Sequence, residues 1–382
     1  ASAHPARLAG TLEALQDRGE IGLVRPVAIV NRLVVEGTAA GILRLAESPE
    51  VARIIPEWTS AERARAGRGE ASGGVSMGES FENWALAAIG APELWNQGLD
   101  GSGVVVASID TGVSGDHEQL RGGMQDEAPG WYDPVEGRPE PYDSHGHGTS
   151  VLTVAVGRNV AGRTIGVAPG ARWAAALGNY RNVYSRIRMT LAADWVLREA
   201  RPDVLINAWS DDSDPCTRFD LPFIDAWKAA EIFVVFPAGN SGPAPESGEA
   251  PAQLSGTYPD GGPVFSVAGL APGGQVHAES SRGPSRCGTH PFPTLAAPGA
   301  EIPFAFPGGS DRYGAGDGTS LAAGIVAGGA ALLLQAEPDL DVSGLERALV
   351  AGARDLDPEG HDPASGAGRL DLEAALAAAR ER

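Results

Sequence analysis

Four polar residues stand at the ends of apolar segments in this sequence. Asp110 follows the apolar run 104–109, Asn240 follows the run 232–236, and His147 and Ser320 each open a segment with helical character. Nucleophilic acyl transfer needs a serine, an imidazole that takes and returns its proton, and a carboxylate that orients the imidazole. An amide such as that of Asn240 adds a donor for the oxyanion formed in the reaction. The residue types together therefore predict attack of a serine on a carbonyl group.

Each of these segments also has a simpler interpretation. Ser320 lies in a Gly-Thr-Ser context where an ordinary helix cap is common, and Asn240 lies where turn residues are common. The Asp-Thr-Gly at 110–112 matches half of an aspartic-protease dyad, but no second Asp-Thr-Gly occurs. His145 and His147 are spaced like metal ligands, yet no Cys, His or carboxylate set completes such a site. The combination of all four residues favours the acyl-transfer hypothesis.

The segments around these residues alternate between strand and helix patterns after residue 83. Strands are predicted at 104–109, 204–209, 232–236 and 264–269, and helices at 147–156, 187–198, 222–230, 320–335, 344–351 and 371–379. This alternation predicts an α/β fold with an open, mainly parallel sheet flanked by helices on both faces. In such sheets, reactive groups lie at the carboxyl ends of strands and at the adjacent helix starts. All four polar residues occupy such positions.

The N-terminal part of the chain has a different pattern. Residues 1–58 predict a small α+β module with helices at 5–17 and 39–46, a β-rich run at 21–35 and a strand at 51–55. The composition of residues 59–80 changes to Ala, Glu and Arg and then to Gly and Ser, which is typical of a linker open to proteolysis. The main domain is predicted to be 81–382.

Composition excludes several classes of function. The formal net charge is −20 at pH 7, which argues against binding to nucleic acid or to anionic membranes. No apolar run reaches the roughly 18 uncharged residues of a membrane-spanning helix. No regular calcium-loop pattern occurs. Cys216 and Cys287 allow one disulfide, but the sequence does not establish whether they are joined.

Three segments together resemble the subtilases, the subtilisin-like serine proteases. They are 105–113, 143–157 and 318–328, the order Asp, His, Asn, Ser also matches, and the similarity runs from about residue 83 to residue 378. The resemblance implies a subtilisin-like fold, with Ser320 as nucleophile, His147 as general base and then acid, Asp110 as orienting carboxylate, and Asn240 as oxyanion donor. It implies a secreted, bacterial, monomeric serine endopeptidase acting on polypeptides, with no cofactor needed for the chemistry and structural calcium possible.

By the same resemblance, residues 1 to about 75 look like an inhibitory propeptide. This implies a zymogen that cleaves itself within the linker, the alternative being a merely structural N-terminal module. The chain begins without Met and without an apolar signal segment, which fits a trimmed secretory precursor as well as a shortened chain.

The sequence departs from the subtilase pattern near the expected substrate site. Ala-Trp-Ser at 208–210 replaces Ser-x-Gly on the strand that pairs with substrate, which predicts narrower binding. Asp211 and Asp212 follow, which predicts a preference for basic substrate residues. Gly324-Ile325 replaces Pro-His, which predicts an altered first turn of that helix. The primary pocket is predicted to be bounded by two segments and made shallow by Phe236; its residues are Ala208, Trp209, Ser210, Phe236, Pro237, Ala238 and Gly239.

Two alternatives to a general endopeptidase remain open at this point. The altered strand at 208–210 and its acidic neighbours also fit a dedicated processing protease that trims one precursor peptide. A subtilase-fold pseudoenzyme that acts as a binding module is the alternative from another class. The complete set of Asp110, His147 and Ser320 argues against this second alternative.

Overall fold

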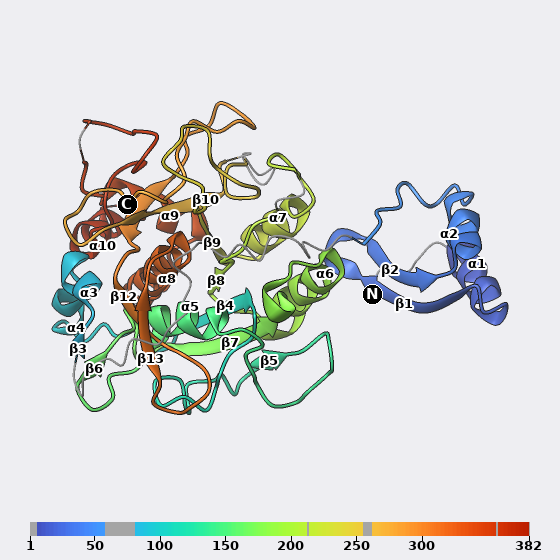
Figure 1. The fold of residues 1–382 in the computed structure, drawn as a ribbon, viewed down its shortest axis with the longest axis horizontal. Helices are drawn as coiled ribbons and strands as arrows, with labels where there is room; N and C mark the ends of the chain where they lie inside the picture. Colours follow the sequence, from blue (N-terminus) through green and yellow to red (C-terminus); the bar gives the residue numbers. More distant parts are fainter. Residues whose placement is uncertain (1–5, 58–80, 212–213, 255–261, 357, 382) are drawn as a thin grey trace.

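A seven-stranded sheet forms the centre of the molecule. The computed structural model describes residues 6–57, 81–211, 214–254, 262–356 and 358–381. The strands lie in the order β11-β10-β9-β8-β4-β7-β5, and every neighbouring pair is parallel (Figure 1). This confirms the predicted α/β fold. The strands are β4 (Val105–Asp110), β5 (Trp131–Tyr132), β7 (Arg172–Leu177), β8 (Val204–Ile206), β9 (Phe233–Pro237), β10 (Phe265–Leu270) and β11 (Leu295–Pro298).

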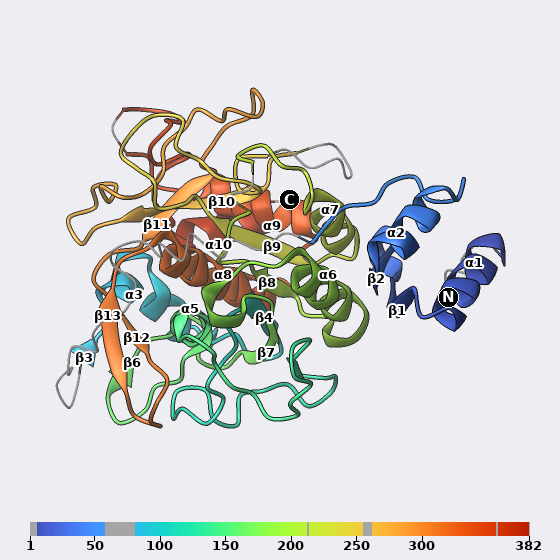
Figure 2. The ribbon, with the colours of Figure 1, turned by 45° about the vertical axis from the view of Figure 1, so that its right-hand side comes forward.

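Helices cover both faces of this sheet. One face carries α5 (His147–Val156) and α8 (Thr319–Ala336), with α3 (Trp84–Ala88), α4 (Ala91–Trp95), α9 (Val342–Ala351) and α10 (Leu372–Arg380) around them. The other face carries α6 (Arg186–Trp195), extended by a π-helical turn at Val196–Ala200, and α7 (Leu221–Ala229) (Figure 2).

Each strand supplies both cores because successive side chains of a strand point to opposite faces. In β9, Phe233 and Val235 pack in the α5/α8 core, whereas Val234 and Phe236 pack in the α6/α7 core. The smaller elements lie outside the main sheet. They are the antiparallel pair β12 (Ile302–Ala305) and β13 (Tyr313–Gly316), the parallel pair β3 (Phe81–Glu82) and β6 (Arg163–Thr164), and a 3-10 turn at Tyr180–Asn182.

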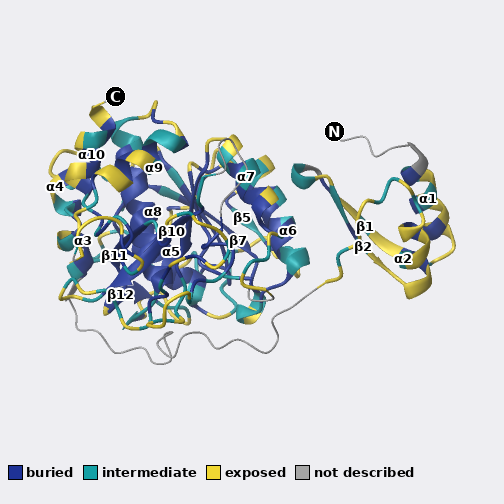
Figure 3. Cartoon of the chain, turned by 90° about the horizontal axis from the view of Figure 1, so that it is seen from above, coloured by how far each residue is buried: buried dark blue, intermediate teal, exposed yellow. Residues whose placement is uncertain are grey.

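Helix α8 is the central helix of the molecule. Of the helices in the described residues, it alone is long and apolar enough to cross a membrane, and 83% of it is buried inside the protein (Figure 3). Its glycines allow direct contact with α5. A Cβ on Gly324 would lie 2.8 Å from the Val151 carbonyl oxygen, and a Cβ on Gly328 would lie 2.7 Å from that of Ala155. Gly328 and Ala155 each lie four residues, about one helical turn, after Gly324 and Val151. The two helices therefore run side by side in the same direction.

The N-terminal residues form the predicted α+β module. It consists of α1 (Ala6–Asp17), β1 (Ile21–Val27), a 3-10 turn at Ala28–Val30, β2 (Arg32–Gly37) and α2 (Ala39–Ala46), with β1 and β2 antiparallel. Its own core contains Leu8, Leu12, Leu15, Ile21 and Leu45. The predicted strand at 51–55 was wrong, because these residues pair with no strand in the described part of the chain.

The end of the β1–β2 hairpin contacts the α6/α7 face of the main domain, and α1 and α2 project away from it (Figure 1). Val27 and Val34 of its hairpin join the core formed by α6 and α7. Arg32 donates a hydrogen bond to the Phe219 carbonyl oxygen (3.2 Å), and its guanidinium carbon lies 4.4 Å from the centre of the Phe219 ring. Burial lowers the pKa of Arg32, while the nearby Asp220 opposes that shift. The hairpin therefore inserts a cation as well as apolar side chains into this face.

Glu57 makes a second connection between the module and the main domain. Its two carboxylate oxygens accept hydrogen bonds from the Ser185 hydroxyl (2.6 Å) and the Ile187 backbone N–H (3.0 Å). Both donors lie at the start of α6, where backbone N–H groups lack partners within the helix and favour negative charge. The predicted linker at 59–80, which follows directly, lies outside the described residues.

A buried carboxylate lies beneath this interface. Asp220 is fully buried at the start of α7, and this burial raises its pKa to about 7, with the nearby Asp211 adding to the rise. The Tyr184 hydroxyl donates a hydrogen bond to Asp220 (3.1 Å). This hydrogen bond and the charges of Arg32 and Arg186 oppose the rise in pKa, because they favour the charged carboxylate. Asp220 therefore changes charge near neutral pH.

Candidate active site

Asp110 is the last residue of β4, near the middle of the sheet, and it is 1% exposed. Its Oδ1 accepts hydrogen bonds from His147 Nδ1 (2.7 Å) and from the Thr111 backbone N–H (2.6 Å). A carboxylate at Nδ1 fixes the imidazole tautomer in which Nδ1 carries the proton and Nε2 is the basic nitrogen. The structure thus brings together two of the residues that the sequence singled out.

Glycines allow the loop after β4 to contact the first turn of α5. Gly112 has a φ of +106°, and a Cβ there would lie 2.1 Å from the Tyr142 carbonyl oxygen. A Cβ on Gly148 would lie 2.2 Å from the Gly112 carbonyl oxygen and 3.0 Å from Cβ of Asp110. No other residue type fits these two positions without moving the backbone. His147 is therefore held against Asp110 by main-chain packing as well as by a hydrogen bond.

Asp143 is a positioning residue that the sequence analysis did not recognise. Its carboxylate accepts hydrogen bonds from Thr111 Oγ1 (2.8 Å), the Gly146 N–H (2.7 Å) and the Thr149 N–H (2.8 Å). The first donor belongs to the Asp110 loop and the other two to the start of α5. One carboxylate thus joins the segments that carry Asp110 and His147. Its sequence signal was an aspartate just before a predicted helix start.

Ser320 is the second residue of α8, in the first turn whose N–H groups have no carbonyl partner within the helix. It is 8% exposed. The preceding Gly318 is fixed by a hydrogen bond from its N–H to the Gly299 carbonyl oxygen (2.7 Å). Since α5 and α8 touch at Val151 and Gly324, each four residues after His147 and Ser320, these two residues open neighbouring, parallel helices.

Asn240 follows β9 and contacts the start of the same helix. Its Oδ1 accepts hydrogen bonds from both the backbone N–H and the hydroxyl of Thr319 (3.0 Å each). This fixes the orientation of the amide, so that Nδ2, which has no acceptor among the described residues, lies beside Gly318 and the Ser320 backbone N–H. Thr319, which the sequence analysis did not single out, also accepts a hydrogen bond from the Gly239 N–H (3.2 Å).

The two segments predicted to bound the primary pocket are the continuations of β8 and β9. Among the described residues, no hydrogen bond involves the backbone of Ala208, Trp209 or Ser210. Pro237 ends β9, Ala238 is buried, and Gly239 leads into Asn240. The rings of Trp209 and Phe236 pack edge to face (5.3 Å between centres) in the α6/α7 core. Because Phe236 is fully buried there, the prediction that its ring makes the pocket shallow was wrong.

The structure does not support the effects predicted for two further departures from the family pattern, Asp211 and Gly324-Ile325. Asp211 is buried and forms an ion pair with Arg186 (3.5 Å), so its carboxylate is directed into the protein; Asp212 lies outside the described residues. Helix α8 continues without interruption through Gly324 and Ile325, so the predicted alteration of its first turn is not found.

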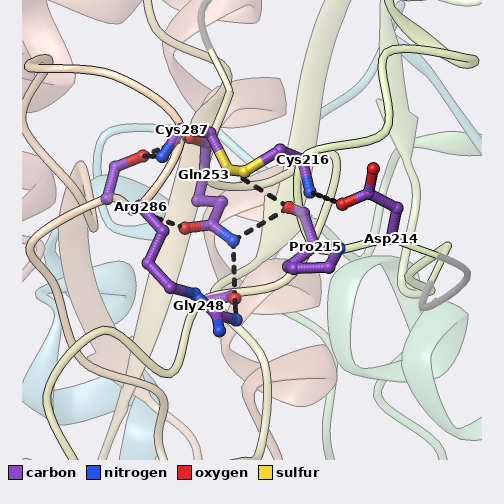
Figure 4. The surroundings of a disulfide bond; sticks show 8 residues. Asp214, Pro215, Cys216, Gly248, Gln253, Arg286 and Cys287 are labelled. Atoms are coloured by element: carbon purple, nitrogen blue, oxygen red, sulfur yellow. Dashed lines mark hydrogen bonds between the residues drawn. A yellow bond between two sulfur atoms is a disulfide. The ribbon is translucent and has the colours of Figure 1, made fainter.

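Cys216 and Cys287 form a disulfide that joins the segment after Ser210 to the loop after β10 (Figure 4). No group of three or more His, Cys, Asp or Glu residues in the described ranges is placed to hold a metal ion.

Comparison with known proteins establishes the family. The sequence profile of the subtilase family matches residues 101–368. The chain belongs to the subtilase family. This subtilase is 31% identical to bacillopeptidase F of Bacillus subtilis over 373 residues, which cover 90% of this chain but only 25% of that protein. It is 30% identical to the serine protease AprX of Bacillus subtilis (72% of this chain, 67% of that protein) and to subtilisin BL of Lederbergia lenta (67% and 85%).

Membership in this family indicates a serine-type peptidase and supports a proteolytic function. Subtilases need no cofactor for catalysis.

Proposed function

We propose that this subtilase is a serine endopeptidase that hydrolyses peptide bonds through an acyl-enzyme. The observation that carries the proposal is the hydrogen bond between Asp110 and His147 at the start of α5, beside the parallel helix α8, whose second residue is Ser320. Ser320 is largely buried but keeps 8% of its surface exposed. Catalysis needs no metal or cofactor in this scheme, because every proton transfer uses a side chain of this chain.

In the proposed reaction, the hydroxyl of Ser320 attacks the scissile carbonyl while His147 Nε2 takes its proton. Asp110 holds the ring and stabilises the imidazolium that forms. The oxyanion receives hydrogen bonds from Asn240 Nδ2 and the Ser320 backbone N–H. His147 then protonates the leaving amine, and water releases the acyl group by the reverse sequence. The unpaired backbone of 208–210 offers a strand for the substrate to extend.

The N-terminal module is proposed to be an inhibitory propeptide. It comprises residues 1–58, with self-cleavage in 59–80 and the peptidase domain at 81–382. The docking of its hairpin on α6 and α7 and the capping of α6 by Glu57 support this assignment. The disulfide supports secretion, because such bonds persist in oxidising compartments. The proposal is thus a secreted bacterial zymogen, active as a monomer on polypeptides.

Labelling with a fluorophosphonate tests the proposal directly. We expect one adduct per chain, located at Ser320 by peptide mass mapping, and no adduct in the Ser320→Ala variant. We also expect the wild-type chain to lose its N-terminal module and the Ser320→Ala chain to stay intact. A purified Ser320→Ala preparation that still matures, or a wild-type chain that neither reacts with the probe nor hydrolyses casein, contradicts the proposal.

A further inference from the structure

The segment Glu249–Ala250 connects the two sides of the predicted primary pocket. The Asp211 N–H, directly after Ser210, donates to the Ala250 carbonyl oxygen (3.0 Å) and forms a β-bridge with this residue. The Ser241 hydroxyl, directly after Asn240, donates to Glu249 Oε1 (2.7 Å). The continuations of β8 and β9 are therefore joined by two adjacent residues, one of which carries a carboxylate.

The carboxylate of Glu249 lies beside the segment that holds the proposed oxyanion donor. Its Cδ lies 3.7 Å from the position that a Cβ on Gly239 would occupy. Glu249 thus accepts a hydrogen bond from the residue after Asn240 and lies next to the residue before it. The substrate residue that supplies the scissile carbonyl must place that carbonyl at Asn240 and Ser320, so its side chain enters this neighbourhood. Glu249 is positioned to meet it.

Glu249 is only partly exposed, and its charge is not neutralised within the protein. Among the described residues, no lysine, arginine or histidine forms an ion pair with it. Arg286, which lies nearby in the fold, instead donates to the Gly248 carbonyl oxygen (3.1 Å). Since only Oε1 has a hydrogen-bond donor in the described chain, Oε2 is available to a cationic ligand.

The backbone around Glu249 is fixed by Gln253 and the adjacent disulfide (Figure 4). The Gln253 side-chain NH₂ donates to the carbonyl oxygens of Gly248 (2.7 Å) and Pro215 (2.9 Å), and its Oε1 accepts from the Arg286 N–H (3.0 Å). The Gln253 backbone N–H donates to the Glu249 carbonyl oxygen (3.2 Å). A carboxylate on such a fixed segment binds a cation with little ordering cost.

We propose that Glu249 is the specificity-determining residue of this site and selects lysine or arginine as the substrate residue that supplies the scissile carbonyl. This inference rests on the proposed peptidase function and assigns the basic preference to a residue other than Asp211, whose carboxylate is already paired with Arg186. The cationic head group replaces water at Oε2 and forms a charge-assisted hydrogen bond with a partly desolvated partner.

Peptide p-nitroanilides that differ only in the residue before the scissile bond (Arg, Lys, Phe, Leu or Glu) test the proposal on the enzyme that the full-length chain yields by maturation. We expect wild-type kcat/KM to be highest for Arg and Lys. In Glu249→Gln, the ratio of kcat/KM for Arg over Phe falls about 10- to 100-fold, the size expected for loss of one charge-assisted contact. In Glu249→Lys, the preference shifts toward the Glu substrate. The matched control is Glu246→Gln, an exposed glutamate of the same loop, which keeps the wild-type ratio.

The possible outcomes separate this inference from the proposed function. A chain that is labelled at Ser320 and cleaves the Phe or Leu substrate better than Arg and Lys overturns the role of Glu249 and leaves the peptidase function intact. An unchanged Arg over Phe ratio in Glu249→Gln does the same. A chain that cleaves none of the substrates and is not labelled overturns both.

Discussion

The two faces of the central sheet are covered in different ways. On one face, α5 and α8 meet through glycine and backbone carbonyl groups, and their first residues include His147 and Ser320. On the other face, α6 and α7 enclose a buried carboxylate, Asp220, and contact the arginine of a separate module. The first contact is uncharged and closely packed, whereas the second contains charges whose balance depends on pH.

The difference between the two faces indicates which contacts fix the positions of helices and which contacts can be broken without moving them. Main-chain contacts at Gly324 and Gly328 leave no space for a side chain, so close packing fixes the position of α5 relative to α8. Hydrogen-bonded and charged contacts at the α6/α7 face can be lost one at a time when the module leaves. On the proposed function, chemistry is built on the first face and inhibition acts through the second.

The largest expected effect is a loss of kcat caused by substitutions on the α5/α8 face. His147→Ala should lower kcat about 10⁶-fold, and adding Ser320→Ala should cost little more, since triad residues act as a unit; these magnitudes were measured in a related subtilisin. Single-turnover kinetics with a p-nitroanilide measure the loss. The control is His145→Ala, whose exposed side chain lies two residues away and should keep kcat within about threefold. Equal losses in both variants contradict the assignment.

The contact between α5 and α8 is tested by Gly324→Ala. A Cβ there meets the Val151 carbonyl oxygen at 2.8 Å, so the helices must separate. We expect a loss of about 1–3 kcal/mol in unfolding free energy. We also expect kcat to fall about 100-fold, because a displacement near 1 Å has that effect on positioned groups. Gly10→Ala in α1, where nothing lies within 4 Å, should not destabilise the protein. Full activity in Gly324→Ala would show that the close contact does not set the site.

On the other face, Arg32→Ala should weaken docking of the module. It removes the hydrogen bond to the Phe219 carbonyl oxygen, the contact with the Phe219 ring and a cation near Asp220. We expect inhibition about 10-fold weaker, seen as an earlier onset of peptidase activity after self-cleavage. Arg44→Ala changes an arginine of the same module that pairs only with Glu20 in the described chain, and it serves as control. Identical onset times for the two variants would exclude a role for Arg32.

The last expected effect concerns pH. Burial raises the pKa of Asp220 to about 7, so between its unfolded pKa near 4 and about 7 the folded state holds a proton that the unfolded state has released. Stability should therefore fall as pH rises through this window, by at most about 1.4 kcal/mol per pH unit. Thermal unfolding of Ser320→Ala from pH 4.5 to 8 should show this slope, and adding Asp220→Asn should flatten it. Parallel profiles would contradict the raised pKa.

The sequence predicted the helices and strands whose own residues carry a clear helical or strand pattern. Helix α5 has the predicted bounds of 147–156, and α8 extends the predicted helix by one residue at each end. Strand β7 (Arg172–Leu177) was missed because its alanines favour helix formation in isolation, and only burial between β4 and β5 makes it a strand. The strand predicted at 204–209 ends at residue 206. The Asn207 N–H still donates to the Val235 carbonyl oxygen of β9 (3.0 Å), and only residues 208–210 lack a backbone hydrogen bond in the described part of the chain.

For the site, sequence reasoning located residues at strand ends and helix starts, because chain order and sheet topology determine where these meet. It did not find Asp143, Thr319 or Glu249. Their partners are loop atoms from other segments, and no local pattern predicts how such loops close. Asp211 was misassigned for the same reason, since its pairing with Arg186 depends on how α6 packs.

On the proposed function, the disulfide affects how long an enzyme surrounded by copies of itself stays intact. Cys216 and Cys287 are 71 residues apart, and the ring that they close contains both Asn240 and the exposed turn 243–246. A cut in that turn opens the ring without releasing either fragment. A nicked molecule therefore still runs as one piece on a non-reducing gel, and its two ends remain tethered where they can keep their native contacts.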